Sequence, residues 1–106
     1  MSVDRIYHFA DPDEWDQSAG VGEYHPQCLL DDGFIHAATQ IQIPGVVSRH
    51  LRGRGERIKL TLNVALLGQR LKFERNHPAG DLFPHIYGAI PLNAVVSAER
   101  FDPDCD

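Results

Sequence analysis

The chain has 106 residues, of which 42% are hydrophobic and 24% are charged, and it carries a formal net charge of −5 at pH 7. This length and composition are typical of one globular domain, which excludes a disordered or a fibrous protein. The negative charge argues against nucleic acid as a broad surface partner, because that contact needs clustered lysines and arginines.

The N-terminal third of the sequence predicts a strand, a helix and a turn-rich segment. Residues 3–10 show the two-residue period of a strand. Asp11 is followed by a proline and, three residues later, by Glu14, and this arrangement is typical of a helix start. Gly20 ends that helix, and the glycine and proline residues across 21–32 indicate turns.

The central part of the sequence predicts two strands and the main helix between them. Residues 33–38 are almost wholly apolar, as expected of a short central strand that is covered on both sides. Thr39 and Gln42 have the spacing of a capping box, so we expect the main helix over 43–52. The clean alternation over 57–63 predicts a half-exposed strand.

The C-terminal part predicts strands over 70–75, 83–88 and 94–101, and a loop over 76–81. Pro84 has no backbone N–H, so we expect its strand to lie at a sheet edge. The order of elements favours an α+β fold with a small mixed or antiparallel sheet and two to three short helices. A single domain over 1–101 and a flexible tail over 102–106 are expected.

The sequence also predicts where the protein resides. Residues 1–5 lack the basic start of a signal peptide, and no apolar stretch approaches the ~20 residues that span a bilayer. Cys28 and Cys105 are the only cysteines, and we expect no disulfide between them. We therefore expect a soluble cytoplasmic protein, a monomer or a homodimer, without a membrane partner.

The sharpest local feature of the sequence is a set of histidines among aromatic or apolar residues: His8, His25, His36 and His85. Histidine suits ribose or phosphate binding, proton transfer and metal ligation, but each of these rings could instead be hydrogen-bonded within the core. His36 has the stronger case for a ligand pocket, because a histidine in an apolar strand must find hydrogen-bond partners. Tyr87 shares a strand face with His85, which predicts either a pocket wall or an aromatic core edge. His50 and His77 are expected at the surface.

Other kinds of site have less support. Five basic residues lie within eleven positions and predict either a site for a small anionic ligand or a solvated helix end: Arg49, Arg52, Arg54, Arg57 and Lys59. No histidine pair has the spacing of a zinc protease and no Cys-x-x-Cys occurs, so no metal is assigned, although ligands from separate strands remain an alternative. Cys28 would need a base such as His25 to act as a nucleophile. Glycine-rich nucleotide motifs are absent from the sequence.

Four strings are specific when taken together in their order and spacing: Ile6-Tyr7-His8, Gly33-Phe34-Ile35-His36-Ala37-Ala38-Thr39, Pro44-Gly45-Val46 and Phe83-Pro84-His85-Ile86-Tyr87-Gly88. Across nearly the whole chain they resemble the landmarks of the bacterial family called domain of unknown function 952 (DUF952). That family usually has a serine or cysteine at the position of Ala38, so no hydroxyl or thiol acts there in this chain.

The resemblance implies a domain similar in fold to the ADP-ribosyltransferases, in which a small split α+β sheet holds NAD in a cleft. Tyr7 and His8 resemble the first-strand pair whose histidine positions the adenosine ribose of NAD. His36 resembles the second-strand histidine of the RNA 2'-phosphotransferase branch. Many transferases also use a glutamate on a later strand, but the matching region here, 83–88, holds no carboxylate. This argues against glutamate-dependent ADP-ribosyl transfer to protein.

The leading hypothesis from the sequence is a histidine-lined cleft that binds NAD or an ADP-ribose-like nucleotide between the first two strands, with NAD as cofactor. The expected catalytic residues are His36 and His85, and the expected ligand-binding residues are Tyr7, His8, Thr39, Arg49 and Tyr87. His8 would contact a ribose, His36 would lie near the pyrophosphate or the reacting ribose, and Arg49 would bind a phosphate.

The hypothesis leaves two classes of protein open. An NAD-dependent transferase, of the ADP-ribosyl or RNA 2'-phosphotransferase type, would displace nicotinamide or process a phosphorylated ribose. The alternative is a non-catalytic nucleotide-binding or protein-interaction domain that keeps the cleft. In either case His8 and His36 should each present a ring nitrogen to the same cavity.

Overall fold

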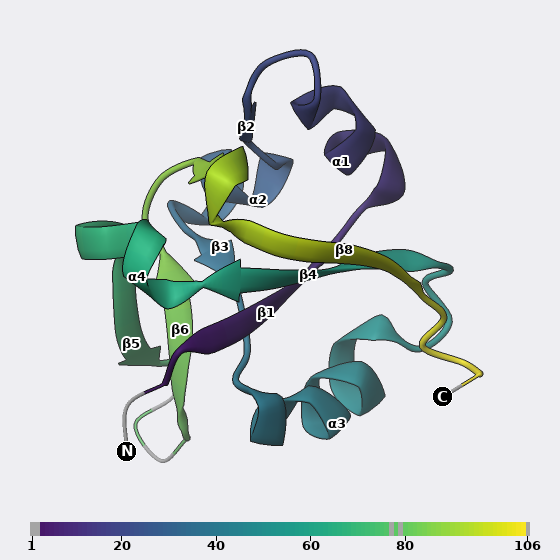
Figure 1. The fold of residues 1–106 in the computed structure, drawn as a ribbon. Coiled ribbons are helices and arrows are strands. Elements are labelled where there is room, and N and C mark those ends of the chain that lie inside the picture. Colours follow the sequence, from purple (N-terminus) through teal and green to yellow (C-terminus); the bar gives the residue numbers. More distant parts are fainter. Residues whose placement is uncertain (1–2, 77, 79, 106) are drawn as a thin grey trace.

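The computed structural model describes residues 3–105, apart from 77 and 79 (Figure 1). Its strands are β1 (Arg5–Ala10), β2 (Glu23–Tyr24), β3 (Ile35–His36), β4 (Arg57–Asn63), β5 (Leu71–Arg75), β6 (Leu82–Ile86), β7 (Ile90–Pro91) and β8 (Val95–Phe101). Its α-helices are α1 (Pro12–Ser18), α2 (Gln27–Asp32), α3 (Ile43–Val46) and α4 (Val64–Leu67), and short 3₁₀ turns cover Gln40–Gln42, Gly68–Arg70 and Leu92–Ala94. The predicted α+β class, with small antiparallel sheets and a few short helices, is confirmed.

Two three-stranded antiparallel sheets form the framework of the fold. One has the strand order β1-β4-β8 and the other has the order β3-β6-β5, while β2 pairs with β7. An isolated bridge joins the two larger sheets, where Tyr7 and Ala38 exchange backbone hydrogen bonds of 2.8 Å in both directions. The framework is therefore one split sheet, whose halves separate on either side of this bridge.

Pro84 explains why the sheet splits at this point. β6 lies between β3 and β5, so the prediction of an edge strand over 83–88 is wrong. The Pro84 carbonyl accepts from the Ala37 N–H at 3.1 Å, but proline has no N–H to return the second bond of an antiparallel pair. The ladder between β3 and β6 therefore ends there, and the next residue, Ala38, pairs with β1.

In the segment after the bridge the predicted capping box is confirmed, but the predicted helix is not a regular α-helix throughout. The Gln42 side chain accepts from the Thr39 N–H at 3.0 Å. The predicted helix over 43–52 forms as α3 followed by a π-helical turn over Val47–Leu51. Such wide turns often occur at functional sites, and this one carries Arg49, a predicted ligand-binding residue.

The core lies beneath the two sheets and is made mainly of branched aliphatic side chains. Its fully buried members include Ile6, Tyr24, Ile35, Leu60, Leu62, Leu67, Ile86 and Ile90. The alternation on β4 predicts that Ile58, Leu60 and Leu62 face the core, and the structure buries Leu60 and Leu62, while Ile58 is only partly buried. Figure 1 shows α1 and α3 on opposite sides of the β1-β4-β8 sheet. Among the helices described here, none is long and apolar enough to cross a membrane.

Residues 102–105 follow β8 and contact the segment before β4. Pro103 is fully buried, and the Asp104 carboxylate accepts from the Gly53 N–H at 3.1 Å. The flexibility of this tail stays a prediction. No disulfide joins Cys28 to Cys105 within the part of the chain that the structure describes, as predicted.

Candidate functional site

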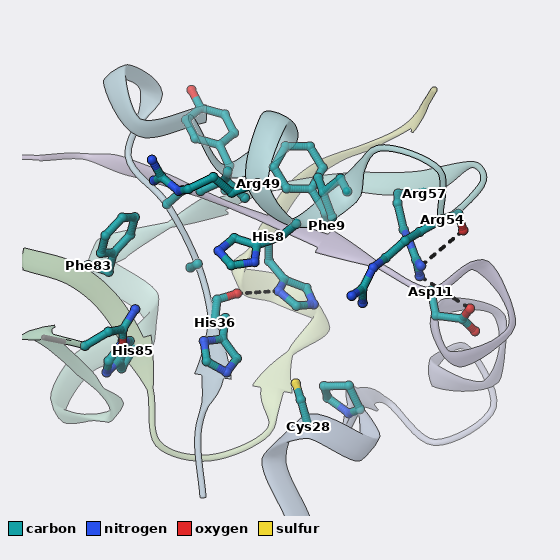
Figure 2. A pocket seen from close by; sticks show the side chains of 18 of the residues that line it. His8, Phe9, Asp11, Cys28, His36, Arg49, Arg54, Arg57, Phe83 and His85 are labelled. Carbon is teal, nitrogen blue, oxygen red and sulfur yellow. Dashed lines mark hydrogen bonds and ion pairs between the residues drawn. The ribbon is translucent and has the colours of Figure 1, made fainter. Parts of the chain in front are cut away.

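A cleft of about 860 Å³ lies where the two halves of the sheet separate (Figure 2). Clefts of this size commonly hold small-molecule ligands. Five of the seven predicted site residues line it: Tyr7, His8, His36, Arg49 and His85. The other two do not, because Thr39 caps the turn after the bridge and Tyr87 lies at the surface beyond His85. The chain thus brings most of the predicted residues together.

His8 is buried on β1, and both of its ring nitrogens have partners within the protein. Nδ1 lies 2.6 Å from the His36 carbonyl oxygen, and Nε2 lies 2.8 Å from the Tyr24 hydroxyl. A carbonyl can only accept, so Nδ1 carries the proton, and Nε2 accepts from the tyrosine O–H. Burial lowers the pKa of His8 to about 4, so this ring is neutral at pH 7.

This hydrogen bonding corrects the prediction that His8 offers a ring nitrogen to a ligand. Although His8 lines the cleft, neither nitrogen is available. The physical reason is that a histidine buried this deeply must be hydrogen-bonded internally or incur a desolvation cost. His8 instead fixes the backbone of His36 across the split between β1 and β3.

His36 differs from His8 because its side chain is half exposed. The prediction that its strand is covered on both sides is therefore wrong for the face that carries this ring. Nε2 of His36 lies 2.9 Å from Oδ2 of Asp32. Gly33 ends α2 with a φ of 84°, and this left-handed turn brings Asp32 back beside the strand. With Nε2 on the carboxylate, Nδ1 has no hydrogen-bond partner among the described residues.

His85 lies opposite His36 in the β3–β6 register, and the two ring centroids are 5.9 Å apart. The side chain is only 4% exposed, and Phe34 stacks on the ring with a centroid separation of 4.0 Å. Nδ1 of His85 lies 3.1 Å from Oε1 of Glu74 on the neighbouring strand β5. Its Nε2 is buried and has no hydrogen-bond partner.

Glu74 belongs to the site, although the sequence analysis did not predict it as a site residue. It accepts hydrogen bonds from the Tyr87 hydroxyl and from His85, and these bonds hold its pKa below the usual value. The same contact raises the pKa of Tyr87, because the hydroxyl donates its hydrogen bond to the carboxylate. Because an ionised carboxylate only accepts, Nδ1 of His85 carries a proton, so the lone pair of the neutral form of the ring lies on Nε2. Region 83–88 holds no carboxylate, but β5 supplies one.

Arginines line the cleft from the π-helical turn, from β4 and from the segment between them. Arg49 and Arg54 line it, and no ion pair to either is found among the described residues. Arg57, by contrast, lies 3.6 Å from Asp11. A methyl group on Gly45 would lie 3.1 Å from Nη2 of Arg49, so the glycine leaves room for the guanidinium.

The remaining candidates from the sequence are less well placed for chemistry. Cys28 lines the cleft, but burial raises the pKa of its thiol, which disfavours the nucleophilic thiolate. His25 is exposed away from the cleft, His50 is exposed at its edge, and His77 lies outside the described residues. No group of three or more metal-ligating side chains is found in the described part of the chain.

Sequence reasoning missed Tyr24, Asp32 and Glu74, which bind the three histidines. Asp32 is four residues before His36, but the contact depends on the turn at Gly33 rather than on a helix. Glu74 needs the β5–β6 register to be known, so no local signal could have identified it. Tyr24 lies on β2 and contacts His8, which is distant in the sequence, so no local signal could have identified it either.

A family model and solved structures each match most of the chain. The family model described as protein of unknown function (DUF952) matches residues 9–98. Among curated proteins nothing matches. The crystal structure of protein CC0527 from Caulobacter crescentus is similar, with 28% identity and a TM-score of 0.82, covering 92% of this chain and 86% of that chain. The solution NMR structure of the same protein has 28% identity and a TM-score of 0.78, covering 92% and 84%.

Proposed function

The chain belongs to the DUF952 family, and we propose that its cleft binds NAD or an ADP-ribose-like nucleotide. The observation that carries this proposal is the position of Arg49 and Arg54, which line the same cleft as His36 and His85 without an acidic partner among the described residues. A ligand that carries both phosphate and ribose could bind its phosphate to the two arginines and its ribose to the two histidines.

The phosphates are assigned to the arginines. The guanidinium group binds phosphate through two parallel N–H donors, and Arg49 and Arg54 have these donors available. The acidic residues that line the cleft, Asp11, Glu14 and Asp81, form no ion pair with Arg49 or Arg54 within the described part of the chain. Asp11 is paired with Arg57, and the Glu14 carboxylate accepts from the Gln27 N–H at 2.7 Å, which leaves Asp81 as the acid without such a contact among the described lining residues.

The base and ribose are assigned to the rings of the cleft. Tyr7, Phe9 and Phe83 line it, and each is only partly buried. Aromatic side chains in this state offer faces on which a nucleobase can stack. The split sheet supports the proposal of an ADP-ribosyltransferase-like fold. The proposed relation to the RNA 2'-phosphotransferase branch rests on the resemblance of the His36 segment. In this proposal His8 acts as a positioning residue for His36 and does not contact the ribose.

The test is calorimetric titration of ADP-ribose and NAD into the protein and its Arg49→Ala variant. Loss of a charged hydrogen bond to phosphate is expected to weaken binding about tenfold to a hundredfold. The matched control is Arg100→Ala, which removes an equally charged side chain on β8, 84% exposed and outside the cleft. Its affinity should stay within twofold of the original.

The outcomes separate the two classes of function. Equal losses in both arginine variants would indicate general charge attraction rather than a site. Failure of ADP-ribose, NAD and 2'-phosphorylated nucleotides to bind would overturn the proposal, and the non-catalytic protein-interaction domain would replace it.

Gly45→Ala should separate binding from stability. Alanine in place of a helical glycine stabilises a fold by about 0.5–1 kcal/mol, so the melting temperature should rise by a few degrees. The new methyl group, however, would lie 3.1 Å from Nη2 and push the Arg49 side chain aside. ADP-ribose should therefore bind several-fold more weakly to a protein that melts at a higher temperature. Unchanged affinity in calorimetry would show that the position of this guanidinium does not matter.

A further inference from the structure

We infer that His85 and His36 form an acid–base pair that hydrolyses a ribose-linked cyclic phosphodiester, with a nucleoside 2',3'-cyclic phosphate as the simplest substrate. This inference rests on the proposed nucleotide binding by the cleft and names its chemistry. Its basis is the arrangement of two carboxylate–histidine pairs, Asp32–His36 and Glu74–His85, whose rings are 5.9 Å apart on one wall of the cleft.

The two pairs share a geometry that proton transfer requires. In each, one ring nitrogen is held by a carboxylate, at 2.9 Å for His36 and at 3.1 Å for His85, and the other has no hydrogen-bond partner among the described residues. A carboxylate in this position fixes both the tautomer and the orientation of the ring, so that the opposite nitrogen can exchange a proton. Packing alone does not require a carboxylate–histidine pair at both His36 and His85, which lie opposite each other in the strand register.

The unpartnered nitrogen of His85 is the stronger of the two observations. A buried acceptor without a donor costs about 1–3 kcal/mol, and most such atoms in folded proteins have a partner. Oε1 of Glu74 accepts from both His85 and Tyr87, so Nδ1 of His85 carries a proton, and the lone pair of the neutral form of the ring lies on Nε2. This nitrogen is buried in the structure, and a water or hydroxyl proton brought to it with the substrate would complete its hydrogen bonding, which assigns His85 as the base.

His36 takes the role of the acid. Its ring is half exposed, and Asp32 holds Nε2, which leaves Nδ1 as the nitrogen that gives up a proton. With one transferable proton, held by His36, the pair contains both the acid (His36) and the base (His85) that the reaction needs.

The reaction balances without a further reactant. Nε2 of His85 removes a proton from water as the water oxygen bonds to phosphorus. The bond from phosphorus to one ribose oxygen breaks, and Nδ1 of the protonated His36 gives its proton to that oxygen. The product is a nucleoside phosphomonoester, and solvent returns the proton from His85 to His36. Arg49 and Arg54 would hold the phosphate, since phosphate esters favour guanidinium partners.

The test incubates the full chain with adenosine 2',3'-cyclic phosphate and follows the monoester by phosphorus NMR. His36→Ala and His85→Ala are each expected to lower the rate at least a hundredfold. The matched control is His25→Ala, an exposed histidine outside the cleft, which should keep the full rate. Melting curves accompany every variant, and Glu74→Gln serves as a second probe because it keeps the side-chain shape while removing the charge that orients His85.

Each outcome decides the matter, because binding is measured separately. Hydrolysis that is lost in both histidine variants and kept in the control supports the inference. Wild-type protein that binds ADP-ribose but leaves the cyclic phosphate intact overturns it and leaves the proposed function standing. Hydrolysis that persists in a folded His36→Ala variant overturns it as well. Hydrolysis without any binding of NAD or ADP-ribose would instead reject the proposed ligand and keep the acid–base pair.

Discussion

Replacing His8 by alanine is expected to destabilise the fold by about 3–5 kcal/mol, the largest effect of any histidine substitution in this chain. The variant removes the ring that both groups contact, so the Tyr24 hydroxyl and the His36 carbonyl lose their hydrogen bonds to His8. It also leaves a cavity beside Tyr24, whose ring centroid lies 5.3 Å from that of His8. For a domain of this size the melting temperature should fall by more than 10 °C.

Thermal melting followed by circular dichroism measures this effect, with His25→Ala as the control. His25 follows Tyr24 in sequence but is exposed, so its removal should change stability by less than about 0.5 kcal/mol. Tyr24→Phe gives an intermediate test, because it leaves only Nε2 of His8 without a donor. A His8→Ala protein that melts within a few degrees of the original would mean that the hydrogen bonds of His8 contribute little to the fold.

The relative stabilities of the His8→Ala, Tyr24→Phe and His25→Ala variants test whether His8 supports the fold or binds a ligand. If this ring contacted a ligand, its removal would weaken nucleotide binding and spare the fold. The structure favours the opposite result, since both ring nitrogens are engaged and the side chain is 7% exposed. Any loss of binding in a variant that still folds would then arise through displacement of the His36 backbone.

The fold was largely predictable because its elements carry local signals. Asp11 accepts from the N–H groups of Asp13 and Glu14 at 3.2 Å, as an N-cap before proline should. The strand over 57–63 follows its alternation, with Leu60 and Leu62 buried. These features depend on residues near each other in sequence, and period and capping chemistry are enough to place them.

What the sequence could not provide is the pairing of distant strands. The proline of β6 was expected at an edge, yet its missing N–H falls where β3 leaves the ladder and turns to β1. The candidate site depends on the same pairings. His36 and His85 were recognised as single residues, but their approach, and the Glu74 contact, exist only through the registers of β3, β5 and β6.

The stability of the protein should fall as the pH decreases from 6.5 to about 4, and His8 should account for much of the loss. Burial lowers the pKa of this histidine from 6.5 to about 4 in the folded state. Between these values the unfolded chain binds a proton at His8 that the folded chain does not bind, so acid favours unfolding. The free energy of unfolding should decrease by about 3 kcal/mol across this window from His8 alone.

Carboxylates also titrate in this range, and a matched variant is needed to isolate the histidine. Glu74 acts in the same direction, because a carboxyl whose pKa is lowered by folding loses its stabilising effect as the pH falls. His8→Gln keeps a neutral hydrogen-bonding side chain at this position and removes the titration, while every carboxylate remains. Urea unfolding of both proteins at pH 7 and at pH 4.5 should therefore show a smaller acid loss in the variant.

Nitrogen NMR of the histidine rings gives a second measurement that does not depend on how well the glutamine variant folds. The His8 ring should keep a proton on Nδ1 and none on Nε2 down to about pH 4, because the His36 carbonyl can only accept and the Tyr24 hydroxyl donates. Burial also raises the pKa of Tyr24, so the hydroxyl stays a donor throughout this range. A His8 ring that gains its second proton near pH 6.5 would contradict both the neutral tautomer and the predicted loss of stability in acid.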